Sequence, residues 1–177
     1  MSEKDDALVR LAGAADGFIA SMRGVTPSLY VRSPSPGRWS LAENAEHTTV
    51  VIRGVERLFT TRLLAQPLAT DDPARRIRDA DLPRLLEDRE RAIDAPEMVR
   101  PKGRWTTFEE MADSLRTTVR GLSEWGMGVT ADLRGYGYPH PLFGPMDGIQ
   151  WLRFLAIHTD RHARQAEEIL GQLRKLG

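Results

Sequence analysis

Residues 151–173 read WLRFLAIHTDRHARQAEEILGQL, and this stretch decides the fold expected for the chain. Its uncharged residues recur at intervals of three and four, the period of an α-helix with one buried face. The charged residues Arg153, Asp160, Arg164 and Glu167 fall on the opposite side. The pattern predicts a long helix that faces the interior of a helical bundle. Its inward row comprises Trp151, Leu155, His158, His162, Gln165 and Ile169, widened by Leu152, Ala156, Thr159, Ala163, Ala166, Leu170 and Leu173.

Two histidines lie on the inward row of this helix. His158 and His162 are one turn apart, so their ring nitrogens can converge on one ion. The alternative is that both are hydrogen-bonded core residues, which is common for a single inward histidine. We favour the metal because two stacked buried rings find backbone partners less easily than one. A third ligand must come from another part of the chain.

The composition limits the classes of function. The 177 residues contain 25 basic and 25 acidic side chains, interspersed and with zero net charge, which argues against a nucleic-acid partner. There is no cysteine, so a metal site must use nitrogen and oxygen ligands. The charged N-terminus predicts no signal peptide, and no apolar run is long enough for a membrane span. We expect a single cytoplasmic domain over residues 1–177, with no membrane partner.

Three further helices are predicted. The first carries Leu8, Leu11, Ala15, Phe18 and Met22 at helical spacing and stops near Gly24 and Pro27; a loop rich in Pro and Ser follows at 33–37. The second begins at a capping box of Ser40 and Glu43 and runs to about residues 66–67. The third begins at a box of Thr107 and Glu110 and ends at two glycines, and the fourth is capped by Asp147 with Gln150. The third helix carries Phe108, Met111, Leu115, Thr118, Leu122 and Trp125 at core spacing, before Gly126 and Gly128.

His47 lies in the second turn of the second helix and is the candidate third ligand. Glu43, one turn earlier, fits two roles: a helix cap, which we favour, or a fourth ligand or support for His47. Trp39, just before the cap, is expected to pack as a hydrophobic staple.

The link between the second and third helices, residues 67–105, is long and rich in charge. Asp71-Asp72-Pro73 opens it, and Leu82, Leu85, Leu86 and Ile93 are enough for one short helix. A link of this length predicts a crossover rather than a tight antiparallel turn. The sequence therefore predicts an all-α protein: a four-helix bundle with a long crossover between the second and third helices.

Residues 136–145 form an aromatic run rich in Gly and Pro, which we expect to be an irregular loop that rims a site or closes the bundle. His140 lies there between two prolines, which favour an extended backbone, and we interpret it as a structural residue rather than a ligand. Gln165, one turn beyond His162, fits contact with a ligand or closure of the core equally well.

Two stretches of this chain resemble the DinB family of bacterial four-helix-bundle proteins. They are Pro36–His47, PGRWSLAENAEH, and His140–His162, which contains HPLFGP and HTDRH. The resemblance implies a divalent ion, zinc or nickel, held by His47, His158 and His162 near one end of the bundle. It also implies a homodimer and a low-molecular-weight thiol such as bacillithiol or mycothiol, because characterised members are metal-dependent thiol transferases and isomerases.

Three imidazoles leave a divalent ion with an open position, where it can activate water or a thiol at neutral pH. We therefore predict a metal-dependent enzyme, of thiol transferase or hydrolase type, that acts on a small molecule. The alternatives are a non-catalytic metal- or ligand-binding stress-response protein, and a helical interaction protein whose histidines are core residues. No residue can be assigned to proton transfer from spacing.

Other metal sites do not fit the sequence. A metalloprotease helix needs Glu directly after its first His, where this chain has Thr159. A di-iron bundle needs Glu three residues before His on two helices, where this chain has Asn44 and Leu155.

Overall fold

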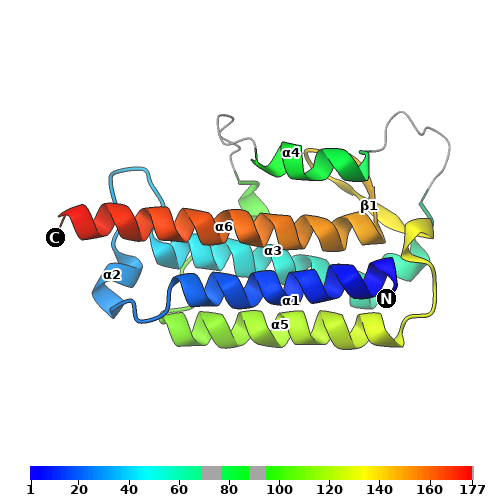
Figure 1. Cartoon of the computed structure of the whole chain (residues 1–177), viewed down its shortest axis with the longest axis horizontal. Helices are drawn as coiled ribbons and strands as arrows, with labels where there is room; N and C mark the ends of the chain where they lie inside the picture. The colour runs from blue at the N-terminus through cyan, green and yellow to red at the C-terminus, as the bar shows by residue number, and fades with distance from the viewer. Residues whose placement is uncertain (69–76, 88–94, 177) are drawn as a thin grey trace.

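The computed structural model describes residues 1–68, 77–87 and 95–176. Four long helices lie side by side with their axes nearly parallel, as Figure 1 shows. They are α1 (Glu3–Ser21), α3 (Leu41–Thr61), α5 (Phe108–Gly128) and α6 (Gly148–Leu176). α1 packs on α5 and α6, and α3 packs on the same two helices. The chain is an all-α four-helix bundle, with a long crossover between α3 and α5, which confirms the predicted fold class.

Capping boxes begin the helices where the sequence predicts them. In α3 the Ser40 hydroxyl accepts from Glu43 N at 3.2 Å, and the Glu43 carboxylate accepts from Ser40 N at 2.8 Å. Thr107 and Glu110 make the same exchange at the start of α5, and Asp147 and Gln150 make it at the start of α6. Each box satisfies backbone N–H groups that have no partner inside the helix.

The end of α3 differs from the prediction, whereas the end of α5 agrees with it. α3 stops at Thr61, and a 3₁₀ turn, η1 (Leu63–Ala65), covers the remaining residues. α5 ends at Gly128, one of the two glycines predicted to end it, and Gly126 lies inside its last turn. A Cβ at Gly126 would lie 2.5 Å from Leu8 Cδ1 of α1, so the glycine serves the close packing of these two helices.

The core lies between the four long helices and matches the predicted inward rows. Of the predicted row on α6, only Gln165 is half-buried; Trp151, Leu155, His158, His162 and Ile169 are buried. The predicted core residues of α1 are buried as well: Leu8, Leu11, Ala15, Phe18 and Met22. On α5, Met111, Leu115 and Leu122 are buried, whereas Phe108, Thr118 and Trp125 are half-buried. Helical spacing therefore identified the buried faces of α1 and α6 and the centre of that of α5.

Short elements fill the connections. α2 (Pro27–Val31), which the sequence analysis did not predict, starts at a Thr26 cap with Pro27 in its first turn. The crossover contains η3 (Asp79–Asp81), α4 (Leu82–Glu87) and η4 (Glu97–Val99), and α4 lies along α6 (Figure 1). Leu82 and Leu86 of α4 are buried. The predicted roles of Asp71–Pro73 and Ile93 lie outside the described residues.

The aromatic run is not an irregular loop but a β-hairpin of β1 (Gly137–His140) and β2 (Gly144–Asp147). Pro139 pairs with Pro145. Proline has no backbone N–H, so neither residue can donate a hydrogen bond to the other across the hairpin. The prediction failed because a proline usually argues against a strand. Here the two prolines lie opposite each other, at a position where the two strands exchange no backbone hydrogen bond. The extended backbone predicted for His140 is confirmed.

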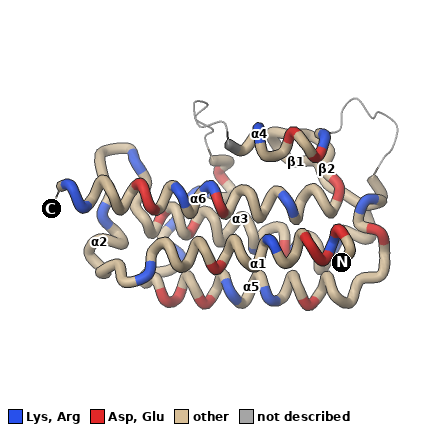
Figure 2. The backbone as a smooth tube through the Cα atoms, viewed as in Figure 1, with Lys and Arg blue, Asp and Glu red and all other residues tan. Residues whose placement is uncertain are grey.

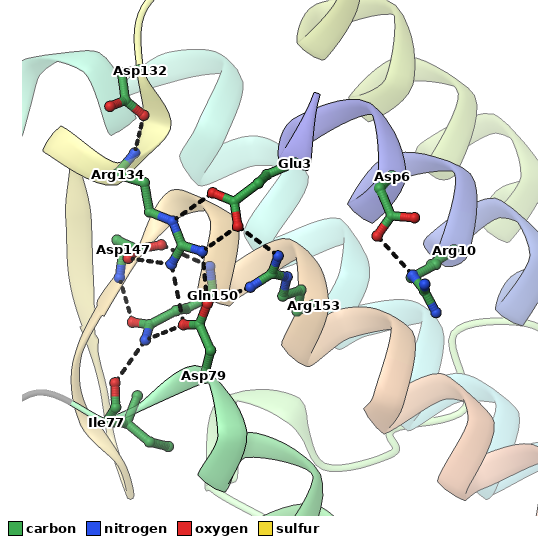
Figure 3. A network of polar contacts seen from close by, with 10 residues as sticks. All are labelled: Glu3, Asp6, Arg10, Ile77, Asp79, Asp132, Arg134, Asp147, Gln150 and Arg153. Carbon is green, nitrogen blue, oxygen red and sulfur yellow. Dashed lines mark hydrogen bonds and ion pairs between the residues drawn. The ribbon is translucent and has the colours of Figure 1, made fainter. Parts of the chain in front are cut away.

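A polar network joins the ends of four elements beside the hairpin (Figure 3). Arg134 donates to Asp79, Glu3 and Asp147, at 2.7, 2.9 and 3.0 Å for the closest contacts. Arg153 of α6 donates to the same Glu3 and Asp79, and Gln150 donates to Asp79 at 2.9 Å. These contacts fix the start of α6, and with it the direction of the helix that carries two of the three histidines.

Acidic and basic residues are both present along α5 and α6, and neither sign covers a whole helix in Figure 2. No helix in the described ranges combines the length and the apolar character that crossing a membrane requires.

Candidate metal centre

The structure brings together His47, His158 and His162, the three histidines that the sequence analysis singled out. Their ligand nitrogens all lie within 4.8 Å of one another. The Nε2 atom of His158 is 3.3 Å from that of His47 and 3.2 Å from that of His162. Three ring nitrogens that face one point are the donor set of a three-histidine metal site. Within the described ranges, no carboxylate joins this group.

Two helices supply this geometry. His158 and His162 lie one turn apart on α6, with ring centroids 4.4 Å apart. His47 comes from the facing side of α3, and its ring centroid is 4.9 Å from that of His162. The exposed fraction is 6% for His47, 9% for His158 and 7% for His162. The cluster is therefore buried, although a small part of each residue is accessible to solvent.

Two of the rings are oriented by oxygen acceptors behind them. His47 Nδ1 donates to the Val99 carbonyl at 2.9 Å, and His162 Nδ1 donates to Asn44 Oδ1 at 2.6 Å. Asn44 also donates through Nδ2 to the His162 carbonyl at 3.0 Å. An acceptor at Nδ1 places the ring proton there and leaves the Nε2 lone pair free for a metal. Both rings are therefore held as ligands in advance.

His158 differs from the other two. Its Nδ1 atom is buried and has no hydrogen-bond partner among the described residues. The ring lies 5.3 Å from the ring of Phe154, one turn earlier on α6. Without an ion, its Nε2–H can donate to only one of the two facing Nε2 atoms. The chain thus keeps an incompletely satisfied polar cluster in its core, which fits a site built for an ion.

Burial lowers the pKa of all three histidines. For His158 and His162 the pKa lies well below the ordinary 6.5, because burial disfavours the charged ring and the neighbouring histidines and Arg161 repel it. Burial also lowers the pKa of His47, although its hydrogen bond to the Val99 carbonyl acts to raise it. The rings are therefore neutral at physiological pH, as metal ligation requires.

The other residues singled out from the sequence have supporting positions. Glu43 is the cap of α3, as favoured above, and is not a ligand. Trp39 is half-buried, as expected for packing, and its ring lies 5.0 Å from that of His47. Gln165, one turn beyond His162 on α6, is half-buried.

His140 belongs to an aromatic cluster beside the centre and is not part of the ligand group. Its ring stacks on Phe143 at 4.4 Å and contacts Phe154 at 4.8 Å and Trp151 at 5.2 Å. Its Nδ1 accepts from Leu142 N at 3.1 Å, and burial lowers its pKa to about 4. Phe154 contacts His140 on one side and His158 on the other. The hairpin residue His140 is therefore one aromatic ring away from the three histidines.

Sequence reasoning missed three groups that support the histidines. Asn44 was considered only as a departure from the di-iron pattern, although its place one turn before His47 on a buried face could have identified it. The Val99 carbonyl leaves no trace in the sequence, because any residue has one. Glu46 is 4% exposed and accepts hydrogen bonds from the segment that carries Val99.

Comparisons with known proteins agree with this description. The sequence profile of the DinB superfamily matches residues 10–166. The chain belongs to the DinB superfamily. It is 23% identical over 152 residues to the uncharacterized protein YuaE of Bacillus subtilis (strain 168), covering 84% of this chain and 87% of YuaE. The fold matches the crystal structure of TT2238, a four-helix bundle protein, with a TM-score of 0.59 and 22% identity over 93% of this chain and 98% of that one.

Proposed function

We propose that this protein binds one divalent ion through His47, His158 and His162 and uses it to transform a small molecule. The observation that carries the proposal is the convergence of three neutral, buried Nε2 atoms, with separations of 3.2 and 3.3 Å from His158 to its two neighbours. Nitrogen donors of this kind suit zinc and nickel.

The chain's own residues prepare the ligands before an ion arrives. Val99 and Asn44 hold two rings in the tautomer that exposes the Nε2 lone pair. Burial keeps the rings uncharged, so little proton release accompanies binding at neutral pH. A divalent ion held there supplies Lewis acidity, which favours the deprotonated form of a thiol or of water.

Three protein ligands leave a coordination position for an exogenous group, which is typical of catalytic rather than structural sites. This favours a thiol transferase or hydrolase type of reaction, in line with the resemblance to the DinB family. The second candidate is a non-catalytic metal- or ligand-binding stress-response protein. The near-complete burial of the histidines favours it, because substrate must pass the rim to reach the centre.

Cobalt distinguishes the two candidates. We expect the Co(II)-loaded protein to develop a thiolate charge-transfer band when a low-molecular-weight thiol is titrated in, because the thiol occupies the open position. A spectrum unchanged by thiols and by azide would mean that the ion is closed off, and would favour the non-catalytic protein. The small-molecule substrate and the homodimer remain predictions; sedimentation of the metal-loaded chain measures the latter directly.

A further inference from the structure

Residues 95–105, called the strap here, contact the ring of His47 through one backbone carbonyl. The strap contains η4 and leads into α5. Its Val99 carbonyl accepts from His47 Nδ1 at 2.9 Å, on the side of the ring opposite the nitrogen that faces His158. The orientation of one candidate ligand therefore depends on where the strap lies.

The carboxylate of Glu46, the residue just before His47 on α3, binds the other end of this strap. Glu46 Oε1 accepts from Lys102 N at 2.7 Å, and Oε2 accepts from Gly103 N at 2.8 Å and Arg104 N at 3.1 Å. The Arg104 guanidinium adds an ion pair at 2.5 Å. Three successive backbone donors and one cation thus surround a carboxylate that is 4% exposed.

Two consecutive residues of α3 hold the strap at two points. Glu46 fixes its turn at 102–104, and His47 binds its carbonyl at Val99. The turn itself needs Gly103, whose φ of +73° is a conformation that residues with a Cβ rarely adopt. Position 103 has open space around it, so this constraint comes from the backbone alone.

From these contacts we propose that Glu46 is a positioning residue for the metal centre. By fixing the strap, it places the Val99 carbonyl behind His47, selects the Nδ1–H tautomer, and keeps Nε2 available for the ion. The proposal rests on the proposed metal binding and adds a residue that touches neither the ion nor its ligand rings. Groups behind a ligand typically change metal affinity by about 10- to 100-fold when removed.

Glu46→Gln is the direct test, because it replaces one carboxylate oxygen with an NH₂ group that must face backbone N–H donors. We expect zinc affinity, measured by competition with a chromophoric chelator, to fall about 10-fold or more. Glu110→Gln is the matched control. Glu110 also accepts from backbone N–H groups, at Thr106 and Thr107, but these residues lie beyond the strap, whose turn at 102–104 is bound by Glu46. The zinc affinity of the Glu110→Gln variant should equal that of the wild type.

Gly103→Ala tests the strap without changing a charge. Gly24→Ala is its control, because Gly24 has φ +77° and open space as well but lies between α1 and α2. We expect only the substitution at Gly103 to weaken zinc binding. This pair also covers the case in which Glu46→Gln fails to fold.

Nitrogen-edited NMR of the metal-free protein gives a second readout. The imidazole of His47 should be the Nδ1–H tautomer in the wild type and both controls, and should lose that preference in Glu46→Gln and Gly103→Ala. Wild-type zinc affinity in these two variants would overturn the positioning role and leave the metal site standing. A wild type that binds no zinc would overturn the proposed function as well.

Discussion

The Nε2 atoms of His47 and His158 lie 3.3 Å apart, although 111 positions separate the two residues in sequence. The Nδ1–H of His47 is already committed to Val99, so its Nε2 presents a lone pair to His158. His162 presents a second lone pair to the same atom, at 3.2 Å. One proton on His158 cannot satisfy both neighbours, whereas a divalent ion between the three rings can.

Asn44→Ala should weaken zinc binding by about 10- to 100-fold, because it removes the acceptor that orients His162. It should also lower the free energy of unfolding of the metal-free protein by about 1–3 kcal/mol, since a buried ring N–H loses its partner. Chelator competition and denaturant unfolding measure the two effects. Thr48→Val is the control: Thr48 is equally buried on α3, but its hydroxyl donates only to the Asn44 carbonyl. A similar loss of zinc affinity in Thr48→Val would contradict the role of Asn44.

His158→Leu should abolish zinc binding without destabilising the metal-free protein. The leucine fills a similar volume and removes the buried Nδ1, for which the described part of the chain offers no partner. We expect the free energy of unfolding to change by no more than about 1 kcal/mol, because removal of the buried Nδ1 offsets the loss of the Nε2–H donor to one neighbouring ring. A clear loss of stability would instead favour the interpretation of these histidines as core residues, since it would mean that His158 stabilises the fold.

The metal-free protein should lose stability as the pH falls below 6.5. The folded pKa of His158 and of His162 is well below the ordinary 6.5, and that of His140 is about 4. Below pH 6.5 the unfolded chain therefore binds protons that the folded chain does not, and unfolding becomes more favourable. Denaturant titrations at a series of pH values should show a plateau above 6.5 and a decline below it. In His158→Leu the free energy of unfolding should decline less steeply below pH 6.5. A decline as steep as that of the wild type would contradict the lowered pKa of His158.

Removal of the metal should leave the bundle folded. The four long helices bury apolar faces against one another without any contribution from an ion. Zinc at 100 times its dissociation constant should then add about 2.7 kcal/mol to the free energy of unfolding. Circular dichroism of chelator-treated protein checks the first statement, and an unfolded spectrum would contradict it.

Much of the fold could be predicted because it depends on local patterns. The spacing of Leu8 to Met22 and of Trp151 to Leu173 identified buried helix faces, and Ser-Glu or Thr-Glu pairs identified helix starts. The end of the third helix at Gly128 was predicted, but the contact of Gly126 with Leu8 of another helix was not, because it depends on tertiary packing. The hairpin at 137–147 was missed because its two prolines face each other, which only the register reveals.

The candidate ligands could be proposed from sequence because histidines at helical spacing on an inward face are rare, and burying their polar rings costs free energy. Their supporting groups could not. The Val99 carbonyl is a backbone atom, 52 positions from His47, and the role of Glu46 depends on a strap whose path no periodicity records. Side-chain identity predicts ligands, whereas the orientation of those ligands is set by long-range contacts.

Elemental analysis of the protein purified without an affinity tag tests the central claim most directly, beside His47→Ala and His162→Ala. We predict about one divalent ion per chain in the wild type and none in either variant, because α3 and α6 share one site. Wild-type protein that holds no ion even after reloading with zinc or nickel would contradict this account, as would a full complement of metal in either variant.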